Sequence, residues 1–172
     1  MRHLSRTLQR HRRGSYVLEC ALVCPVLVLL SVGTVVLGMG VFRYQQMASL
    51  ARDGARWASV RGWQYQADLN PYGVASLPMA VTQQDISNYI ASQAVLLNTS
   101  PDALKVQVSW NTDNKQTHTL LDASGNLQLD STGNVIRVTN TITVTVTYNW
   151  IPEALFAGPI TLSSTSTIPM SY

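Results

Sequence analysis

Residues 20–42 read CALVCPVLVLLSVGTVVLGMGVF, an apolar run that contains no charged side chain. A helix of this length spans about 34 Å, which is enough to cross the hydrocarbon core of a bilayer. The run therefore predicts a membrane-spanning helix. The alternative, a buried core helix of a soluble protein, needs a shell of other apolar helices that this chain does not contain. Pro25 removes a backbone hydrogen bond and predicts a kink, which neighbouring helices tolerate in lipid.

The composition of the whole chain fits this interpretation. Of its 172 residues, 46% are hydrophobic and only 12% are charged, against roughly a quarter charged in an ordinary soluble domain. The length allows about one domain beside the membrane segment. Two cysteines exclude a disulfide-stapled miniprotein, and the apolar content excludes a disordered chain.

Charge is distributed unevenly around the apolar run. Residues 1–14 hold five arginines and no acid, whereas the arginines that follow the run are partly offset by Asp53. By the positive-inside rule the N-terminus is cytoplasmic and residues 43–172 lie across the membrane. Because the positive charge flanks the run instead of covering a folded face with interleaved aromatics, no nucleic-acid partner is predicted.

A cleavable signal peptide is the alternative to a membrane anchor. A charged leader before an apolar run is its usual pattern, and Gly38-Met39-Gly40 offers small residues for cleavage. Such cleavage would release a secreted module that starts at Val41. The length of the run and the position of Glu19 at its start favour the anchor.

The boundary before the run carries a second motif. Arg12-Arg13-Gly14 is followed by Ser15-Tyr16-Val17-Leu18-Glu19. This pattern resembles the cleavage site of type IV prepilins and pseudopilins, which a membrane peptidase cuts after the glycine. By that resemblance, cleavage removes residues 1–14, exposes Ser15, and lets Glu19 meet the N-terminal amine of a neighbouring subunit. The alternative is that Glu19 lies at headgroup level near a helix N-terminus.

Two stretches narrow the resemblance to the TadE-like family, minor pseudopilins of the tight-adherence pilus system. Residues 19–27, ECALVCPVL, match its E-x-A-L-V-x-P-x-L pattern, and residues 51–58, ARDGARWA, resemble its A-R-E-G-A-R-Y-A segment. The similarity covers residues 12–61, with departures at Cys20, Cys24 and Asp53. The motif residues inside these stretches are Ala21, Leu22, Val23, Arg52, Asp53, Gly54, Ala55 and Arg56.

The resemblance implies a role in assembly or initiation of a tight-adherence (Flp-type) pilus, with no enzymatic activity and no cofactor. It implies residence in the bacterial inner membrane as a single-pass protein. The implied partners are a prepilin peptidase, a pilus secretion ATPase with its inner-membrane platform, and sibling pseudopilins or pilin. A signal-anchored or secreted binding module of unknown ligand is the alternative function.

Beyond the run, the helical period continues and predicts an unbroken helix over residues 15–61. Small and apolar side chains form a stripe that packs within the chain or against another subunit's stem. Asp53 and Arg56 have the spacing of a surface ion pair. The stripe consists of Tyr44, Met47, Ala48, Ala51, Ala55 and Ala58.

Residues 62–172 are predicted to form an exported α+β domain with a pilin-like arrangement of helices on an antiparallel sheet. An irregular connection over residues 62–81 precedes a helix over residues 85–97, with Thr82 and Asp85 at the spacing of a capping box. Period-two alternation predicts strands at 104–110, 136–150 with a break near Asn140, and 160–168.

Between the strands lies a repeat, DASGNL at 122–127 and DSTGNV at 130–135. Asp, Gly and Asn suit tight turns that need positive φ, whereas the glycine position does not fit a calcium-binding EF-hand loop. His118 stands alone in the exported part, and the sequence contains no catalytic or metal-ligand constellation. The sequence therefore predicts a non-enzymatic protein.

Overall fold

The structure is a computed structural model of the whole chain, and it describes residues 4–63, 65, 81–95, 97–152 and 158–171. Side chains within α1 are described from Tyr16 onward. The contacts divide the chain into two units, residues 1–41 with 152–158 and residues 42–151 with 159–172. The predicted irregular connection at 62–81 lies mostly outside the described residues.

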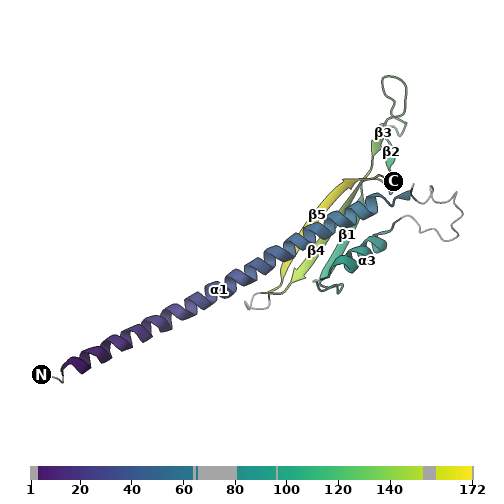
Figure 1. Cartoon of the computed structure of the whole chain (residues 1–172). Coiled ribbons are helices and arrows are strands. Elements are labelled where there is room, and N and C mark those ends of the chain that lie inside the picture. The colour runs from purple at the N-terminus through teal and green to yellow at the C-terminus, as the bar shows by residue number, and fades with distance from the viewer. Residues whose placement is uncertain (1–3, 64, 66–80, 96, 153–157, 172) are drawn as a thin grey trace. The chain divides into compact units, whose positions relative to one another are not determined.

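Helix α1 runs over Leu4–Ser59 as one continuous α-helix (Figure 1). It includes the predicted membrane run and the stripe after it, and it begins before Gly14, so the leader is helical as well. The helix passes through Pro25 without interruption. The first unit consists mainly of α1 up to Val41, and the rest of α1 belongs to the second unit.

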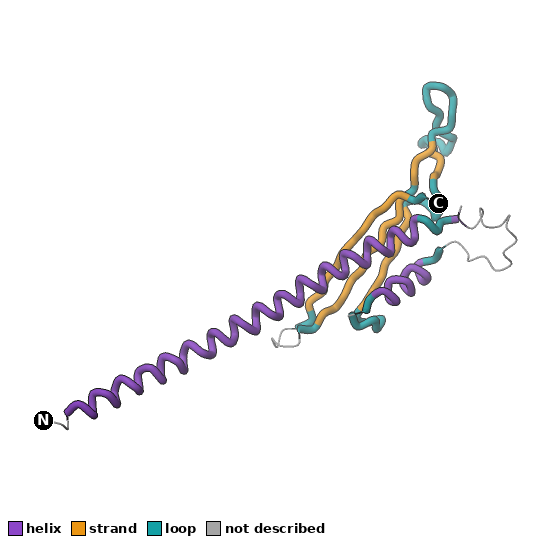
Figure 2. Tube along the Cα trace, viewed as in Figure 1, coloured by secondary structure: helices purple, strands orange, loops and turns teal. Residues whose placement is uncertain are grey.

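The second unit is built on a three-stranded antiparallel sheet in the order β1-β4-β5 (Figure 2). Its strands are β1, Leu104–Trp110, β4, Thr141–Trp150, and β5, Ile160–Pro169. The central strand β4 alternates strictly between buried and half-buried residues, which confirms the predicted half-buried strand. Its buried side chains are Ile142, Val144, Val146, Tyr148 and Trp150.

Helix α3, Gln83–Gln93, and the second half of α1 supply the other side of the core. Ile86 and Ile90 of α3 are fully buried, as are Met47 and Ala51 of α1. The α+β class and the helix-on-sheet arrangement that the sequence predicts are therefore confirmed.

Helix α3 ends earlier than predicted. Ala94 leaves the helical conformation with ψ of 59°, so the helix stops at Gln93 instead of Leu97. Leu97 nevertheless remains buried, because its amide bonds back to the carbonyl of Ala94 at 3.3 Å. The pattern of buried apolar side chains thus continues one turn beyond the last residue of α3.

The predicted capping box at the start of α3 is present. The Thr82 side chain accepts from the Asp85 amide at 3.3 Å, and the Asp85 carboxylate accepts from the Thr82 amide at 2.9 Å. The Thr82 hydroxyl donates to the same carboxylate at 2.7 Å. This side-chain bond, followed by the backbone bond, lowers the pKa of Asp85.

Replacement Thr82→Ala is expected to lower the free energy of unfolding by about 1 kcal/mol, the typical cost of a lost N-cap. The measurement is denaturant unfolding followed by tryptophan fluorescence, since all four tryptophans lie between residues 57 and 150. The matched control is Gln83→Ala, at an exposed position in the same turn, which is expected to change little.

The cap also predicts a pH dependence. A carboxylate whose pKa is lowered by folding stabilises the protein above its unfolded pKa of about 3.9. That contribution disappears as the pH falls through the lowered folded pKa. The difference between wild type and Thr82→Ala is therefore expected at pH 6 and should shrink below about pH 4. A difference that stays constant down to pH 2 would contradict the role of the Asp85 carboxylate.

Strands β2, Thr117–Thr119, and β3, Arg137–Thr139, form a separate two-stranded sheet. The predicted break at Asn140 is confirmed, but the residues before it do not extend the main sheet. Val138 is exposed, and β3 pairs with β2 instead of with a strand of the main sheet. We call residues 117–139 the arm.

The arm carries the two predicted turns. Gly125 and Gly133 have φ of 82° and 85°, the left-handed conformation that glycine adopts readily. Asp122 accepts from the amides of Ser124 and Asn126, and Asp130 repeats this pattern eight residues later. These bonds lower the pKa of both carboxyls, led by the Asn126 amide at Asp122 and by the Thr132 hydroxyl at Asp130.

Candidate functional site

The first candidate site is the apolar surface of α1 in the first unit. Among the described side chains of residues 16–41, most apolar groups are exposed, with Leu22 at 70% and Val28 at 61%, whereas Val36 is buried. Of the described residues, α1 over Tyr16–Ser59 is the one helix long and apolar enough to cross a membrane. This surface is consistent with membrane anchoring, because lipid or other helices can cover it.

The motif residues near the start of α1 share this exposure. Ala21, Leu22 and Val23 are all exposed, and the free cysteines Cys20 and Cys24 are exposed too. The hydroxyls of Ser31 and Thr34 each donate to the carbonyl four residues earlier, at 2.8 Å. These polar groups are thereby satisfied within the helix, as an apolar environment requires.

Glu19 is exposed on this apolar surface. Among the side chains that the structure describes, no cation lies within ion-pairing distance of its carboxylate. Gly14 and Ser15 lie four to five residues before it in the same helix, about 6–8 Å along the axis. The predicted processing residues and Glu19 are thus about one helical turn apart.

The second candidate site is the end of α1 in the second unit, where the ARDGARWA stretch lies. Gly54 is buried and faces both α3 and the sheet. A Cβ atom placed on Gly54 would lie 2.6 Å from Cδ1 and 2.9 Å from Cγ1 of Ile90, and 3.7 Å from Cγ1 of Val144. Glycine therefore allows α1 and α3 to approach more closely than any other residue would.

Ala55 has the same packing role. With Met47, Ala51 and Ala58 it is buried at 0–1% exposure, so the small-residue stripe packs within the chain. Tyr44 departs from the predicted stripe, because half of its surface is exposed. Of the two alternatives that the sequence left open, intramolecular packing is the one that the structure shows for these residues.

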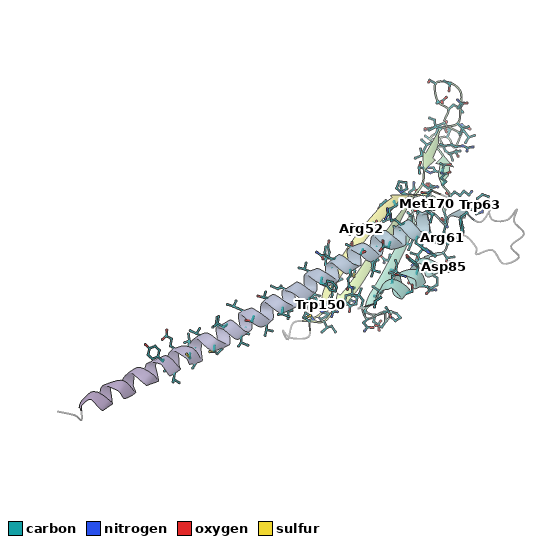
Figure 3. All side chains as sticks on the ribbon, in the orientation of Figure 1. Arg52, Arg61, Trp63, Asp85, Trp150 and Met170 are labelled. Atoms are coloured by element: carbon teal, nitrogen blue, oxygen red, sulfur yellow. The ribbon has the colours of Figure 1, made fainter. Side chains whose placement is uncertain are left out.

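Arg52, Asp53 and Arg56 lie on the opposite, exposed side of the same turns. Figure 3 labels Arg52 among them. The predicted ion pair between Asp53 and Arg56 was wrong: within the described residues, no ion pair joins them. Asp53 instead accepts from the Ser49 hydroxyl at 3.3 Å, and Arg52 donates to the carbonyl of Ala48 at 3.0 Å. Asp53 and Arg52 thus each form a hydrogen bond with a residue one helical turn earlier, and the ion pair that the spacing predicted is not formed.

These side chains line a groove of about 570 Å³ between α1 and β5. Its residues are Ser49, Arg52, Asp53, Arg56, Ser166 and Ile168. Sequence reasoning missed this groove, since more than a hundred residues separate its two walls.

Two aromatic clusters also escaped the sequence analysis. The Arg43 guanidinium donates to the Tyr148 hydroxyl at 3.1 Å and lies 5.5 Å from the centre of the Trp150 ring. At the other end of this part of α1, Trp57 stacks on Tyr89 at 4.8 Å, with Arg61 4.6 Å from the Trp57 ring centre. Both clusters fix α1 to the domain through cation–π and stacking contacts.

His118 lies at the base of the arm against a buried amide. Asn140 is 0% exposed, and its Oδ1 lies 2.6 Å from His118 Nδ1. The Asn140 amide donates to Asp113 Oδ1 at 2.5 Å and to the Lys115 carbonyl at 3.0 Å. Within the described residues no group of three His, Cys, Asp or Glu side chains is placed to hold a metal ion. These hydrogen bonds join the arm to the sheet, so we interpret the network as a structural one.

Comparison with known protein families gives one match. Residues 14–56 match the family described as TadE-like protein. The resemblance predicted from the sequence is confirmed, and the matched segment includes every motif residue from Gly14 to Arg56. No curated protein and no solved structure matches the chain.

The TadE-like match points to a role in the tight-adherence pilus system, and that family is not known as enzymatic. The matched segment crosses both units of the structure. In the first unit its residues form the exposed apolar helix, and in the second they form the close packing at Gly54.

Proposed function

We propose that the chain is a membrane-anchored pseudopilin that acts in assembly or initiation of a tight-adherence pilus. In this proposal a prepilin peptidase cleaves it after Gly14. The observation that carries the proposal is the TadE-like match over residues 14–56, which begins at the glycine of the predicted cleavage site. The protein acts by helix packing and makes no chemical bond itself after processing.

Glu19 supports this function through its surroundings. A charged side chain at the centre of a bilayer helix costs about 2.5–3.5 kcal/mol unless it finds a partner, and Glu19, at the start of the apolar run, bears part of that cost. The described side chains of this chain provide no cation for Glu19. A partner from another chain meets this need, and the α-amine of a neighbouring processed subunit has the required charge.

The arginines before Gly14 support an N-terminus in the bacterial cytoplasm and a domain across the inner membrane. In this arrangement the leader faces the cytoplasmic side, where a prepilin peptidase cuts. A secretion ATPase and its membrane platform then act on the membrane segment, and sibling pseudopilins or pilin provide the packing partners.

Because α1 is helical through Gly14, the peptidase must unwind the helix there to reach an extended backbone. Glycine lowers this cost, since it is about 1 kcal/mol less favourable than alanine within a helix. The position of the glycine thus marks the weakest point of the first helical turns.

The test is the intact mass of the protein from membranes of cells that contain a prepilin peptidase. A chain starting at Ser15 is expected. Replacement Gly14→Leu should leave the leader attached to nearly all molecules, because a side chain obstructs the cleft. The matched control is Gly33→Leu, where an added Cβ meets no atom within 4 Å and cleavage should proceed as in wild type.

Two other masses would contradict the proposal. A chain starting at Val41 would show signal-peptide cleavage and favour the secreted binding module. A chain that keeps Met1 in the presence of the peptidase would leave a signal-anchored protein without prepilin processing.

A further inference from the structure

Among the described residues, strand β5 is an open edge of the sheet, and its composition is unusual for an edge strand. It is ten residues long, lies outermost in the order β1-β4-β5, and contains no charged residue. Natural edge strands usually carry charges, bulges or a covering element that prevent another strand from pairing. The opposite edge, β1, follows that rule, since it carries Lys105 and contacts α3.

A hydrogen bond at the end of β5 shows which of its backbone groups bond to β4 and which face outward. The amide of Met170 donates to the carbonyl of Asn140 at 2.8 Å, and these residues are one step beyond the last pair of the β4–β5 register, Thr141 with Pro169. Bonded pairs alternate along an antiparallel ladder. Leu162, Ser164, Ser166 and Ile168 therefore bond to β4, whereas the backbone groups of Thr161, Ser163, Thr165 and Thr167 face outward.

Pro169 agrees with this alternation. It is at an outward-facing position, where the missing N–H removes no bond to β4. The outward groups thus present up to four N–H donors and five carbonyl acceptors, enough to pair with an extended segment.

The groove lined by Arg52 and Arg56 lies beside this edge on the inner face of the sheet, with Ser166 and Ile168 of β5 in its wall. A strand added to β5 would lie about 4.8 Å farther out. Its inward-facing side chains would then extend over the groove. No ion pair neutralises either arginine within the described part of the chain, so the groove favours an anionic side chain.

We propose that the free edge of β5 accepts an extended segment of another protein chain, and that Arg52 and Arg56 select a segment whose inward-facing side chain is a carboxylate. Main-chain pairing supplies affinity and the arginines supply specificity. This proposal concerns the domain after the membrane segment, so it does not depend on cleavage after Gly14.

The charges disfavour a second copy of this chain as the occupant. Two β5 strands joined antiparallel about a two-fold axis would keep both α1 helices on the same face of the joined sheet. Four arginines would then border the seam, with the two Asp53 carboxylates as the only acids among the groove residues. A partner with its own carboxylate avoids this repulsion.

The test uses the full chain in detergent micelles and fluorescent ten-residue peptides of alternating Thr and Val. In each peptide one inward-facing residue is Glu, placed at successive positions, and a matched set has Gln instead. We expect saturable binding with about a fivefold preference for Glu in at least one register. Arg52→Gln combined with Arg56→Gln should abolish that preference, while Arg137→Gln, on the arm, should retain it.

A second variant separates the strand edge from the groove. Thr165→Pro removes an outward N–H and no backbone bond to β4, and it loses one exposed side-chain bond, between the Thr165 and Thr145 hydroxyls. The domain should therefore remain folded while peptide affinity falls at least about tenfold. Tryptophan fluorescence confirms folding of each variant.

Four results would overturn the proposal. One is the absence of saturable binding by every peptide up to millimolar concentration, and another is binding that Thr165→Pro leaves unchanged. The third concerns competition for the Glu peptide. If glycerol 3-phosphate displaces the peptide at a far lower concentration than acetate does, the arginines bind lipid phosphate instead of a carboxylate. A dimer that is lost in Thr165→Pro, seen by light scattering, would identify a second copy as the occupant and would also overturn it.

Discussion

Replacement Glu19→Ala is expected to abolish pili at the cell surface while leaving the domain after the membrane segment folded. If Glu19 pairs with a neighbour's amine away from water, its removal leaves that amine buried without a partner, at a cost of about 3–5 kcal/mol. Such a loss changes an assembly equilibrium by more than a hundredfold. The measurement is the amount of sheared surface pili, beside the amount of the protein in the membrane.

Membrane insertion is the process that must be separated from assembly. Alanine inserts more favourably than glutamate, so the amount of protein in the membrane should stay the same or rise. Asp102→Ala is the matched control, because Asp102 is an exposed carboxylate in the turn before β1. Normal piliation in Glu19→Ala would contradict the assembly role of this carboxylate and favour the headgroup alternative.

The second large effect is expected at Gly54. Gly54→Ala gains up to about 1 kcal/mol of helix propensity. It also forces a methyl group against the fully buried Ile90, and overpacking of this kind costs about 1–3 kcal/mol. We expect net destabilisation, and a larger loss for Gly54→Leu, measured by denaturant unfolding of the full chain with tryptophan fluorescence.

A double mutant tests the cause. Ile90→Val removes the Cδ1 atom that lies 2.6 Å from the added Cβ, at a cost of about 0.5–1.5 kcal/mol on its own. The double mutant should lose less free energy of unfolding than the sum of the two single-mutant losses, because each change relieves the packing defect that the other creates. Additive losses would show that the contact between these two positions is not responsible.

Much of the fold could be predicted because it depends on local sequence. The apolar run, the Thr82 cap, the alternation around Val144 and the positive-φ glycines each follow from residues within one element. The motif at residues 14–56 could likewise be recognised, because its spacing is a property of one helix.

What could not be predicted depends on contacts between distant residues. Periodicity cannot tell that the strand before Asn140 turns away from the sheet, because the bonds of Asn140 reach back to Asp113 and Lys115. Spacing suggested a pair between Asp53 and Arg56, whereas β5 opens a groove on their side of α1. The ARDGARWA stretch is therefore understood only when its buried glycine and its exposed arginines are seen on opposite sides.

The bonds at the base of the two arm turns form a closed ring. The amide of Leu120 donates to the carbonyl of Ile136, that of Ile136 to Gln128, and that of Gln128 to Leu120, at 2.9–3.1 Å. These three residues are eight apart, so each turn is an eight-residue unit that begins and ends at a member of the ring. A third eight-residue unit would add a fourth residue to the ring and leave strands β2 and β3 unchanged. The arm can therefore accept or lose whole eight-residue units without any change in the sheet that bears it.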